Sequence, residues 1–269
     1  MSTWVFHHEA CLAHIPGTGH PESPQRLRVV MEALRQPEFE DLAWREAPAG
    51  TREQVLLVHR AEYVDAIAAV APSSGLVALD GGDTLMSPGS WEAVMRCVGA
   101  ACAGVDAVLA GEAANVFCAT RPCGHHAEPD GAMGFCIFNQ AAIAAVHALR
   151  THGLQRVAVI DFDVHHGNGT QAAFYHRPEL FFGSSHQSPL YPGTGAASET
   201  GGERQHRQPA AAAGLRQRAV PRAGGQRAAA GIAAFCATAD HRVGRLRRAP
   251  ARSPGPHEPG GRGFCVDHA

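Results

Sequence analysis

Two loops carry the side chains that could do chemistry in this chain. The first reads RPCGHHAEPDGAMGF and places His125 beside His126, between proline- and glycine-containing stretches. Neighbouring imidazoles titrate close to neutral pH and pack poorly in an apolar core, so their occurrence together favours use in a site. The second loop reads DFDVHHGNG and carries Asp161, Asp163 and His165 at alternating positions. Carboxylates and imidazoles in this pattern are typical of metal or acid–base chemistry.

The alternation in the second loop predicts a metal site at the end of a strand. In an extended segment residues two apart project to one side, so Asp161, Asp163 and His165 should converge. Phe162 and Val164 should then point into the packing. A carboxylate and an imidazole suit zinc, although a further protein ligand must come from elsewhere. The alternative is a strand end whose Asp and His side chains make only hydrogen bonds.

The two histidines of the first loop would complete a hydrolytic site above such a metal. Metal-bound water becomes a strong nucleophile near neutral pH, and a histidine within hydrogen-bond reach can accept its proton. A second histidine can stabilise charge or protonate a leaving amine. Each ring needs an orienting partner on its other nitrogen, and Asp161 and Asn168 are available for this. The alternative is a pair of exposed loop histidines without a chemical role.

Helix-like and strand-like segments alternate over the first 200 residues and should position both loops. Apolar residues at helical spacing predict helices at 59–70, 90–109, 140–152 and 24–34, the last with Ser23 as N-cap and Pro24 in its first turn. Short apolar runs predict strands at 115–119, 157–162 and 180–183. Such strands, with a helix between the first two, favour an α/β fold with a parallel sheet covered on both faces. Ligand sites in these sheets lie beyond the carboxyl ends of strands, where both loops fall.

Bulk composition places few limits on the partners. A chain of 269 residues that is 45% hydrophobic suits one sizeable domain or two small ones. A net charge of -2 gives no argument for a specific nucleic-acid partner or an anionic membrane. No signal segment is visible, and Arg96 and Asp106 interrupt the longest apolar region, so no membrane span is predicted. Eight cysteines without a CxxC pair indicate neither a thiolate zinc site nor a disulfide framework, so we expect a cytoplasmic location.

Several other reactive side chains are expected to have structural or peripheral roles. Cys97, Cys102 and Cys136 should be small core residues. His59, close to a tyrosine, should cap and pack rather than catalyse. The histidines of the N-terminal segment are expected at the mouth of a site: His7, His8, His14 and His20.

In combination, the motifs resemble those of one enzyme superfamily. HPESPQRL, RPCGHHA, GFCIFN, DFDVHHGNGTQ and SSHQSPLYPGTG are similar to motifs of the zinc-dependent histone deacetylase superfamily. Its bacterial and class II-like members include histone deacetylase-like amidohydrolases, acetylpolyamine amidohydrolases and acetoin-utilisation proteins. The resemblance covers residues 1–201 and implies the arginase/deacetylase three-layer α/β fold with a mainly parallel sheet, its C-terminal part missing. It also implies a hydrolase that deacetylates an acetylated lysine side chain, an acetylated polyamine or another small amide.

The resemblance implies a role for each residue of the catalytic motifs. Asp163 and His165 would bind Zn2+. His126 would act as general base on the zinc-bound water, with His125 as its partner. Asn168, where many class I members carry aspartate, would orient His126 as in class II-like members.

Further roles follow from the same resemblance. Asp161 would orient the first histidine of the pair. Phe135 would line the narrow acyl-lysine channel, and the carbonyl of Gly134 would face the substrate amide. Ser184, together with Asp161 and Asp163, matches positions that hold a monovalent cation, expected to be K+.

The C-terminal segment, residues 202–269, differs in composition from the rest. From residue 201 onward the chain holds 12 of its 23 basic residues, all arginine, but 4 of its 25 acidic ones and only 8 Leu, Ile, Val, Phe or Met. Such a segment cannot bury enough apolar surface to offset the entropy of ordering it, so we expect it to be disordered. By the resemblance, it should instead supply the third zinc ligand, the Asp of an SAGFDAH-like motif, and an oxyanion-polarising Tyr. Neither is present in the chain as written.

A shifted reading frame would account for both the composition and the missing motif. Moved one base forward, the codons of residues 205–208 permit NIVN, and those of residues 240–259 permit IIVSAGFDAHRHDPLARMN. The Asp of the motif would lie across the codons of Arg247 and Arg248. We therefore interpret the chain as a partial deacetylase domain (1–201) truncated by a frameshift near residues 200–202, followed by an out-of-frame segment. Its activity should be impaired.

Two other functions fit parts of the sequence. A ureohydrolase with two manganese ions would need further carboxylates in a DxHxD pattern, whereas Gly167 follows DVHH here. A non-enzymatic interpretation is an inactive truncated fragment or a binding protein with a basic tail. Bound zinc and turnover of acetyl-lysine would separate the hydrolase from the non-enzymatic protein.

Overall fold

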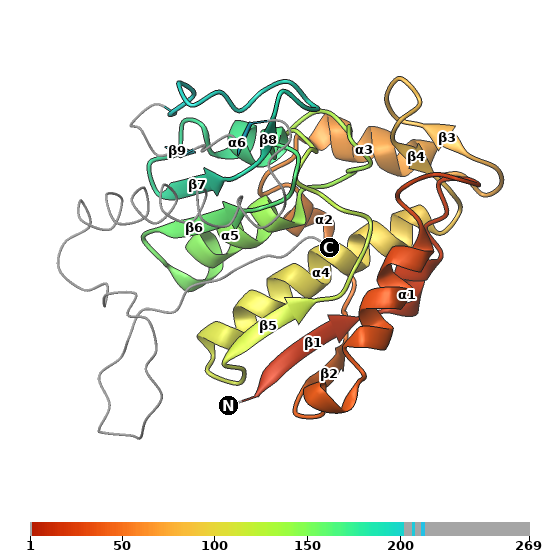
Figure 1. Ribbon diagram of the computed structural model, residues 1–269, viewed down its shortest axis with the longest axis vertical. Helices are drawn as coiled ribbons and strands as arrows, with labels where there is room; N and C mark the ends of the chain where they lie inside the picture. The colour runs from red at the N-terminus through yellow and green to blue at the C-terminus, as the bar shows by residue number, and fades with distance from the viewer. Residues whose placement is uncertain (1, 202–205, 208–210, 213–269) are drawn as a thin grey trace.

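The longest helix, α4 (Ser90–Leu109), runs through the centre of the fold and is buried along most of its length. The computed structural model describes residues 2–201, 206–207 and 211–212 (Figure 1). A helix that is apolar on nearly every side has to be covered all round, and α4 packs against strands on one side and against α5 (Gln140–His152) on another. Gly99 permits a close approach of the loop at 47–50, since a Cβ atom there would lie 2.0 Å from the carbonyl oxygen of Pro48.

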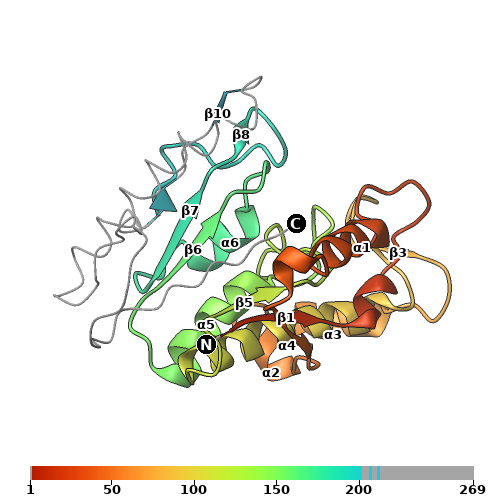
Figure 2. The ribbon, with the colours of Figure 1, turned by 60° about the horizontal axis from the view of Figure 1, so that its bottom comes forward.

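Two parallel three-stranded sheets lead into the loops of interest. The order of the first is β2 (Ala43–Glu46), β1 (Thr3–His7), β5 (Asn115–Cys118), and the order of the second is β6 (Val157–Asp161), β7 (Leu180–Ser184), β9 (His206–Arg207). Within the described residues β5 and β6 do not pair with each other (Figure 2). Both strands, together with α4 and α5, line an apolar pocket. The predicted mainly parallel α/β architecture is confirmed.

The remaining elements are short and lie around these two layers. They are η1 (Glu9–Leu12), α1 (Pro24–Ala33), η2 (Pro37–Phe39), α2 (Arg52–Val55), α3 (Ala61–Val70), the antiparallel pair β3 (Val77–Ala78) and β4 (Leu85–Met86), α6 (Asn168–Phe174), and the parallel pair β8 (Gln187–Ser188) and β10 (Ala211–Ala212).

Most predicted elements are observed, with small shifts at their ends. The helices predicted at 90–109 and 140–152 match α4 and α5, and α1 has Ser23 as N-cap and proline in its first turn, although the serine hydroxyl makes no capping hydrogen bond. The helix predicted at 59–70 begins two residues later, at Ala61, and the ring of His59 accepts a hydrogen bond from the backbone N–H of Asn139 at 2.8 Å. The cysteines expected in the core are buried there: Cys97, Cys102 and Cys136. Strands β1 and β2 were not predicted.

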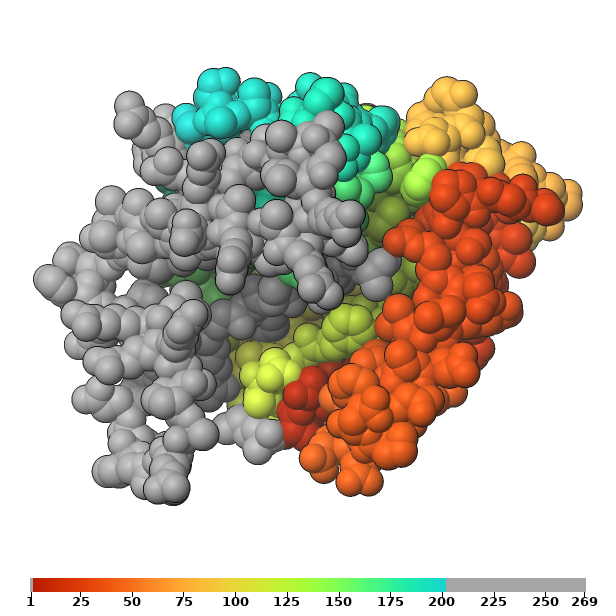
Figure 3. Space-filling view, in the orientation of Figure 1, coloured from red at the N-terminus to blue at the C-terminus, as the bar shows by residue number. Residues whose placement is uncertain are grey.

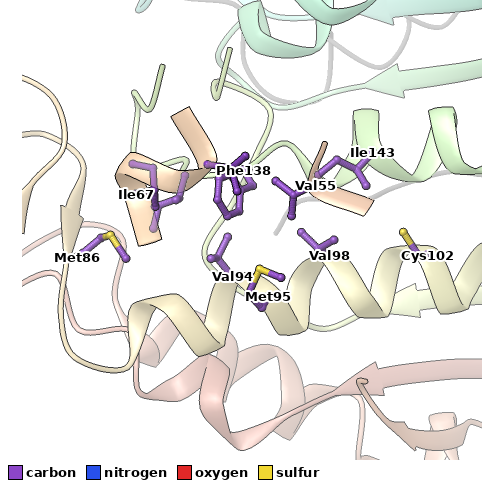
Figure 4. Close-up of a cluster of buried hydrophobic side chains, with 11 residues drawn as sticks. Val55, Ile67, Met86, Val94, Met95, Val98, Cys102, Phe138 and Ile143 are labelled. Atoms are coloured by element: carbon purple, nitrogen blue, oxygen red, sulfur yellow. The ribbon is translucent and has the colours of Figure 1, made fainter. Parts of the chain in front are cut away.

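The largest apolar cluster lies between α2, α3, α4 and α5 (Figure 4). Phe138 is fully buried at its centre, near Val94, Val98 and Ile143. Burying an apolar side chain of this size stabilises a fold by roughly 1.5–3 kcal/mol. Because Phe138 follows directly on the loop that contains the paired histidines, the cluster also holds the end of that loop in place.

The N-terminal segment covers one side of the molecule in the space-filling view (Figure 3). In the part of the chain that the structure describes, no helix combines the length and the apolar character needed to cross a membrane. The segment predicted to be disordered lies outside the described residues, except for β9 and β10, and the proposed boundary at residue 201 stays a prediction.

Candidate metal and acid–base site

The two loops singled out from the sequence meet at the carboxyl ends of the parallel strands. The first follows β5 and contains His125 and His126, whose ring centroids are 4.0 Å apart. The second follows β6, which ends at Asp161. The ring of His165 lies 5.9 Å from the ring of His126, centroid to centroid. Side chains separated by about forty positions in the sequence therefore line one cavity.

His125 is paired with a buried carboxylate. Its Nδ1 lies 2.9 Å from Oδ2 of Asp161, and both side chains are less than a tenth exposed. Burial lowers the pKa of His125, but the charge of Asp161 and the hydrogen bond to it outweigh burial and raise the pKa to about 9. His125 is therefore a cation at neutral pH, with its Nδ1–H donated to Asp161.

His126 is held in the opposite protonation state. Burial and the neighbouring charge of His125 lower the pKa of His126 to about 3, so its ring is neutral. Nδ1 of His126 lies 2.8 Å from Oδ1 of Asn168, and the Asn168 amide nitrogen donates to Oε1 of Glu128 at 2.8 Å. Because Asn168 thus presents its oxygen to the ring, the His126 proton is on Nδ1 and the lone pair is on Nε2.

Asp163 and His165 fit two ligand positions of a zinc ion. Oδ1 of Asp163 lies 3.2 Å from Nδ1 of His165 and accepts the backbone N–H of the same residue at 2.7 Å. Two ligands of one tetrahedral zinc with bonds of about 2.0–2.1 Å lie roughly 3.3 Å apart, which is close to the observed separation. Within the described part of the chain, no third His, Cys, Asp or Glu ligand atom lies within 4.8 Å of both.

One detail of the second loop differs from the prediction. Phe162 and Val164 were expected to point into packing, but they are 53% and 48% exposed. Strand β6 ends at Asp161, and the chain then bends, so strict alternation no longer decides which side chains are covered. The alignment of Asp163 and His165 comes instead from the hydrogen bonds of the turn.

Gly134 and Phe135 form a wall of the same cavity, whose volume is about 510 Å³. Both residues have positive φ angles, 56° and 69°. A Cβ atom on Gly134 would lie 2.5 Å from Cδ2 of His126, so only glycine allows the two to approach. The ring of Phe135 packs edge-on against His20 at 4.7 Å, which places His20 beside this wall. His14, also expected at the mouth, is instead buried with its Nδ1 2.7 Å from the hydroxyl of Ser90.

Tyr191 also lines the cavity but was not predicted as a site residue. Its ring lies 5.1 Å from the ring of His126 and 6.0 Å from that of His165, in edge-on contacts. The only signal in the sequence was its place in the SSHQSPLYPGTG motif.

The buried ion pair that anchors the histidine loop was also missed. Arg121 donates from Nε to Oε1 of Glu22 at 2.9 Å and forms a second, very short contact with Oε2. Its Nη1 donates to the carbonyl oxygens of Cys11 and His14, each at 2.7 Å. This pair joins the HPESPQRL motif to the RPCGHH motif. The residue type at either position does not predict a contact with a residue 99 positions away.

Ser184 lies at the end of β7, paired in register with Asp161 of β6. Its hydroxyl is 2.9 Å from Nδ1 of His186, and the backbone N–H of Ser185 donates to the carbonyl oxygen of Asp161. The structure therefore places Ser184 on the strand beside Asp161, with its hydroxyl engaged by a histidine.

Comparisons with known proteins agree with this architecture. Residues 20–237 match the family model described as histone deacetylase domain. The chain is 39% identical over 221 residues to a histone deacetylase-like amidohydrolase of Pseudomonas aeruginosa, a match that covers 75% of this chain and 58% of that protein. It is 39% identical over 171 residues to the polyamine deacetylase HDAC10 of Homo sapiens, covering 62% of this chain and 26% of that protein.

A solved structure shows the same fold. The crystal structure of the HDA15 HD domain superposes with a TM-score of 0.73 at 32% identity, covering 78% of this chain and 62% of that one. The chain spans less than two thirds of the length of the first curated relatives, with shares of 63%, 58% and 50%.

Proposed function

Since this chain belongs to the histone deacetylase family, we propose that its described part is the acid–base and metal-binding half of a zinc-dependent amidohydrolase. The substrate is an acetylated amine, either an acetyl-lysine side chain or an acetylated polyamine or small amide. The names of two relatives, an amidohydrolase and a polyamine deacetylase, support this class. The observation that carries the proposal is the neutral His126, whose Nε2 lone pair shares a cavity with Asp163 and His165.

Different residues of the cavity would bind zinc, accept a proton and stabilise negative charge. Asp163 and His165 would hold zinc, which would supply a Lewis acid when bound. His126 is placed to take a proton at Nε2 from an attacking water, and Asn168 keeps its ring in the required tautomer. The charged His125 is placed to stabilise negative charge that develops on the substrate.

Neighbouring groups shape the substrate position. Phe135 lines the channel for the acyl chain, and the carbonyl of Gly134 faces the substrate amide. Asp161, Asp163 and Ser184 belong to a site for a monovalent cation, proposed as K+, whose role is to hold the ends of β6 and β7. The adjacent register of Asp161 and Ser184 supports this assignment.

Full activity requires groups outside residues 1–201. The third zinc ligand and an oxyanion donor belong, on this proposal, to a polypeptide encoded in the neighbouring reading frame. Losing one oxyanion donor alone costs roughly 10²–10³-fold in rate, and losing a zinc ligand adds to that. We therefore propose that this chain is a severely impaired member of its family, with the inactive fragment or basic-tailed binding protein as the alternative.

The test compares acetate release by two proteins supplied with zinc. One is this chain, and the other is the product of a gene in which one base is added or removed near the codons of residues 200–202. With an acetyl-lysine peptide and an N-acetylpolyamine as substrates, the corrected protein should be at least ~10²-fold more active. In the corrected protein, His126→Ala should lower kcat/KM by roughly 10²–10⁴-fold, whereas His176→Ala, at an exposed histidine that does not line the cavity, should have no effect. Equal activity of the His126→Ala and parent proteins would rule out the proposed base.

A further inference from the structure

A second cluster of side chains that could bind a metal ion lies at the opposite end of the fold from the cavity. Asp106, His147 and His152 place one ligand atom each within 4.8 Å of the others. Asp106 is in the last turn of α4, and both histidines are near the end of α5. Strand β6 begins shortly after α5 and runs for five residues, roughly 16 Å, before it reaches the cavity, so the two sites cannot share an ion.

We propose that Asp106, His147 and His152 form a binding site for a divalent transition-metal cation, with zinc as the first candidate. Oδ1 of Asp106 lies 2.7 Å from Nε2 of His147 and 2.7 Å from Nε2 of His152. Both imidazoles therefore direct the same type of nitrogen at one carboxylate oxygen. Two imidazoles and a carboxylate are a ligand set that suits Zn2+, Ni2+ or Cu2+.

The present separations are those of hydrogen bonds, and a cation would require a small opening. Ligands on a tetrahedral zinc lie roughly 3.3 Å apart, so each nitrogen–oxygen distance would grow by about 0.6 Å. The side chains of Asp106 and His152 are 49% and 27% exposed and have room to move, while His147 is 9% exposed and provides a fixed ligand. Because Asp106 is exposed to solvent, water can also occupy the remaining coordination position of the metal ion.

Thr151 orients the buried ligand. Its hydroxyl lies 3.1 Å from Nδ1 of His147, one helical turn earlier. A hydroxyl can accept as well as donate, so Nδ1–H of His147 can be donated to Thr151 when Nε2 binds a metal. Metal-binding histidines usually have such a partner on the other ring nitrogen.

The ends of two helices give the site a favourable field. Both α4 and α5 end here, at Leu109 and His152. The carboxyl end of a helix carries partial negative charge and favours a cation, by about 0.3–1 kcal/mol at an exposed position. A metal at this place would join the end of α4, which packs against β5, to the end of α5.

The test is a zinc titration of the full chain by calorimetry, in a His165→Ala background that removes the proposed catalytic ligand. The background protein should bind zinc, and Asp106→Asn or His152→Ala should weaken that binding at least tenfold. Thr151→Val should weaken it by roughly 10–100-fold without removing a ligand. His176→Ala, the matched exposed histidine, should leave it unchanged.

The thermal unfolding midpoint provides an independent check. Saturating zinc should raise it in the His165→Ala protein and in the His165→Ala/His176→Ala protein, but not in the His165→Ala/His152→Ala protein. If zinc affinity and the zinc-dependent rise are the same with and without His152→Ala and Asp106→Asn, the cluster is only a set of hydrogen bonds and the proposal is wrong. Because every protein in the series lacks His165, the outcome does not depend on the proposed catalytic function.

Discussion

At the level of single residues, the two adjacent histidines differ in charge: His125 is a cation and His126 is neutral. The rings of His125 and His126 are 4.0 Å apart, yet the pKa of the first is raised and that of the second is lowered. The difference lies in their partners, since His125 faces the carboxylate of Asp161 and His126 faces the uncharged amide of Asn168. An aspartate at position 168 would raise the pKa of His126 as well, so asparagine favours a neutral base.

Asp161→Asn should lower the pKa of His125 strongly, because burial then acts without an opposing charge. A pH titration followed by NMR of the imidazole resonances measures this directly. In the unchanged, metal-free protein His125 should titrate near pH 9, and His126 should stay neutral down to about pH 3. Asp65→Asn, in an exposed ion pair with Arg52, should leave both values unchanged.

The same substitution changes how stability depends on pH. Because the folded pKa of His125 is above its unfolded value, its stabilising effect is complete below about pH 6.5 and is lost as the pH rises through about 9. Between these values the unfolding free energy of the unchanged protein should fall relative to that of Asp161→Asn, by up to about 1.4 kcal/mol per pH unit. Parallel stability curves for the two proteins would contradict the assignment of His125 as a cation.

At the scale of elements, the histidine loop is held by a buried ion pair between segments distant in sequence. Arg121 and Glu22 are 5% and 2% exposed at their side chains, and Arg121 also caps two carbonyl oxygens of the N-terminal segment. The position of His125 and His126 therefore depends on a segment that contributes no catalytic group.

Glu22→Ala should lower the unfolding free energy by roughly 3–5 kcal/mol, because Arg121 would be left buried without its counter-charge. Chemical denaturation provides the measurement. Glu92→Ala breaks an exposed pair with Arg96 on α4 and should cost only about 0.3–0.5 kcal/mol. Similar losses in the two proteins would show that burial of the Arg121 pair is unimportant.

The elements also show what the sequence could predict. Long periodic helices such as α4 and α5 were predicted to the residue, because their apolar spacing extends over several turns. Strand β2, with only four residues and two of them charged, carries no such signal and gains its conformation from pairing with β1. The meeting of the two loops followed from the rule for parallel strands, whereas the contacts of Tyr191 and Arg121 depend on tertiary packing that spacing does not encode.

In the molecule as a whole, β5 and β6 are edge strands of two separate parallel sheets. Strands β5 and β6 both border an apolar pocket whose other walls are α4 and α5, and within the described residues neither pairs with a strand on that side. Parallel strands normally lie about 4.8 Å from a neighbour on each side within a covered sheet. On the frameshift proposal, strands encoded in the neighbouring frame, such as the one containing IIVSAGFDAH, occupy this gap.

Hydrogen exchange should detect these missing neighbours. In the frame-corrected protein the backbone amides of β5 and β6 should exchange more slowly than in this chain, because new ladder hydrogen bonds protect them. The amides of β1 and β7, which are paired on both sides in the structure, should change much less. Equal protection of β5 and β6 in the two proteins would contradict the proposed filling of the gap.

On the proposed function, Asp163 and His165 bind zinc in the cavity that His125 and His126 also line. Anomalous diffraction at the zinc edge, from crystals of the frame-corrected protein grown with saturating zinc, is the decisive measurement. We predict a peak about 2.0–2.2 Å from a carboxylate oxygen of Asp163 and from Nδ1 of His165, with Nε2 of His126 within reach of a bound water. Ordered Asp163 and His165 side chains with no zinc between them would contradict the account.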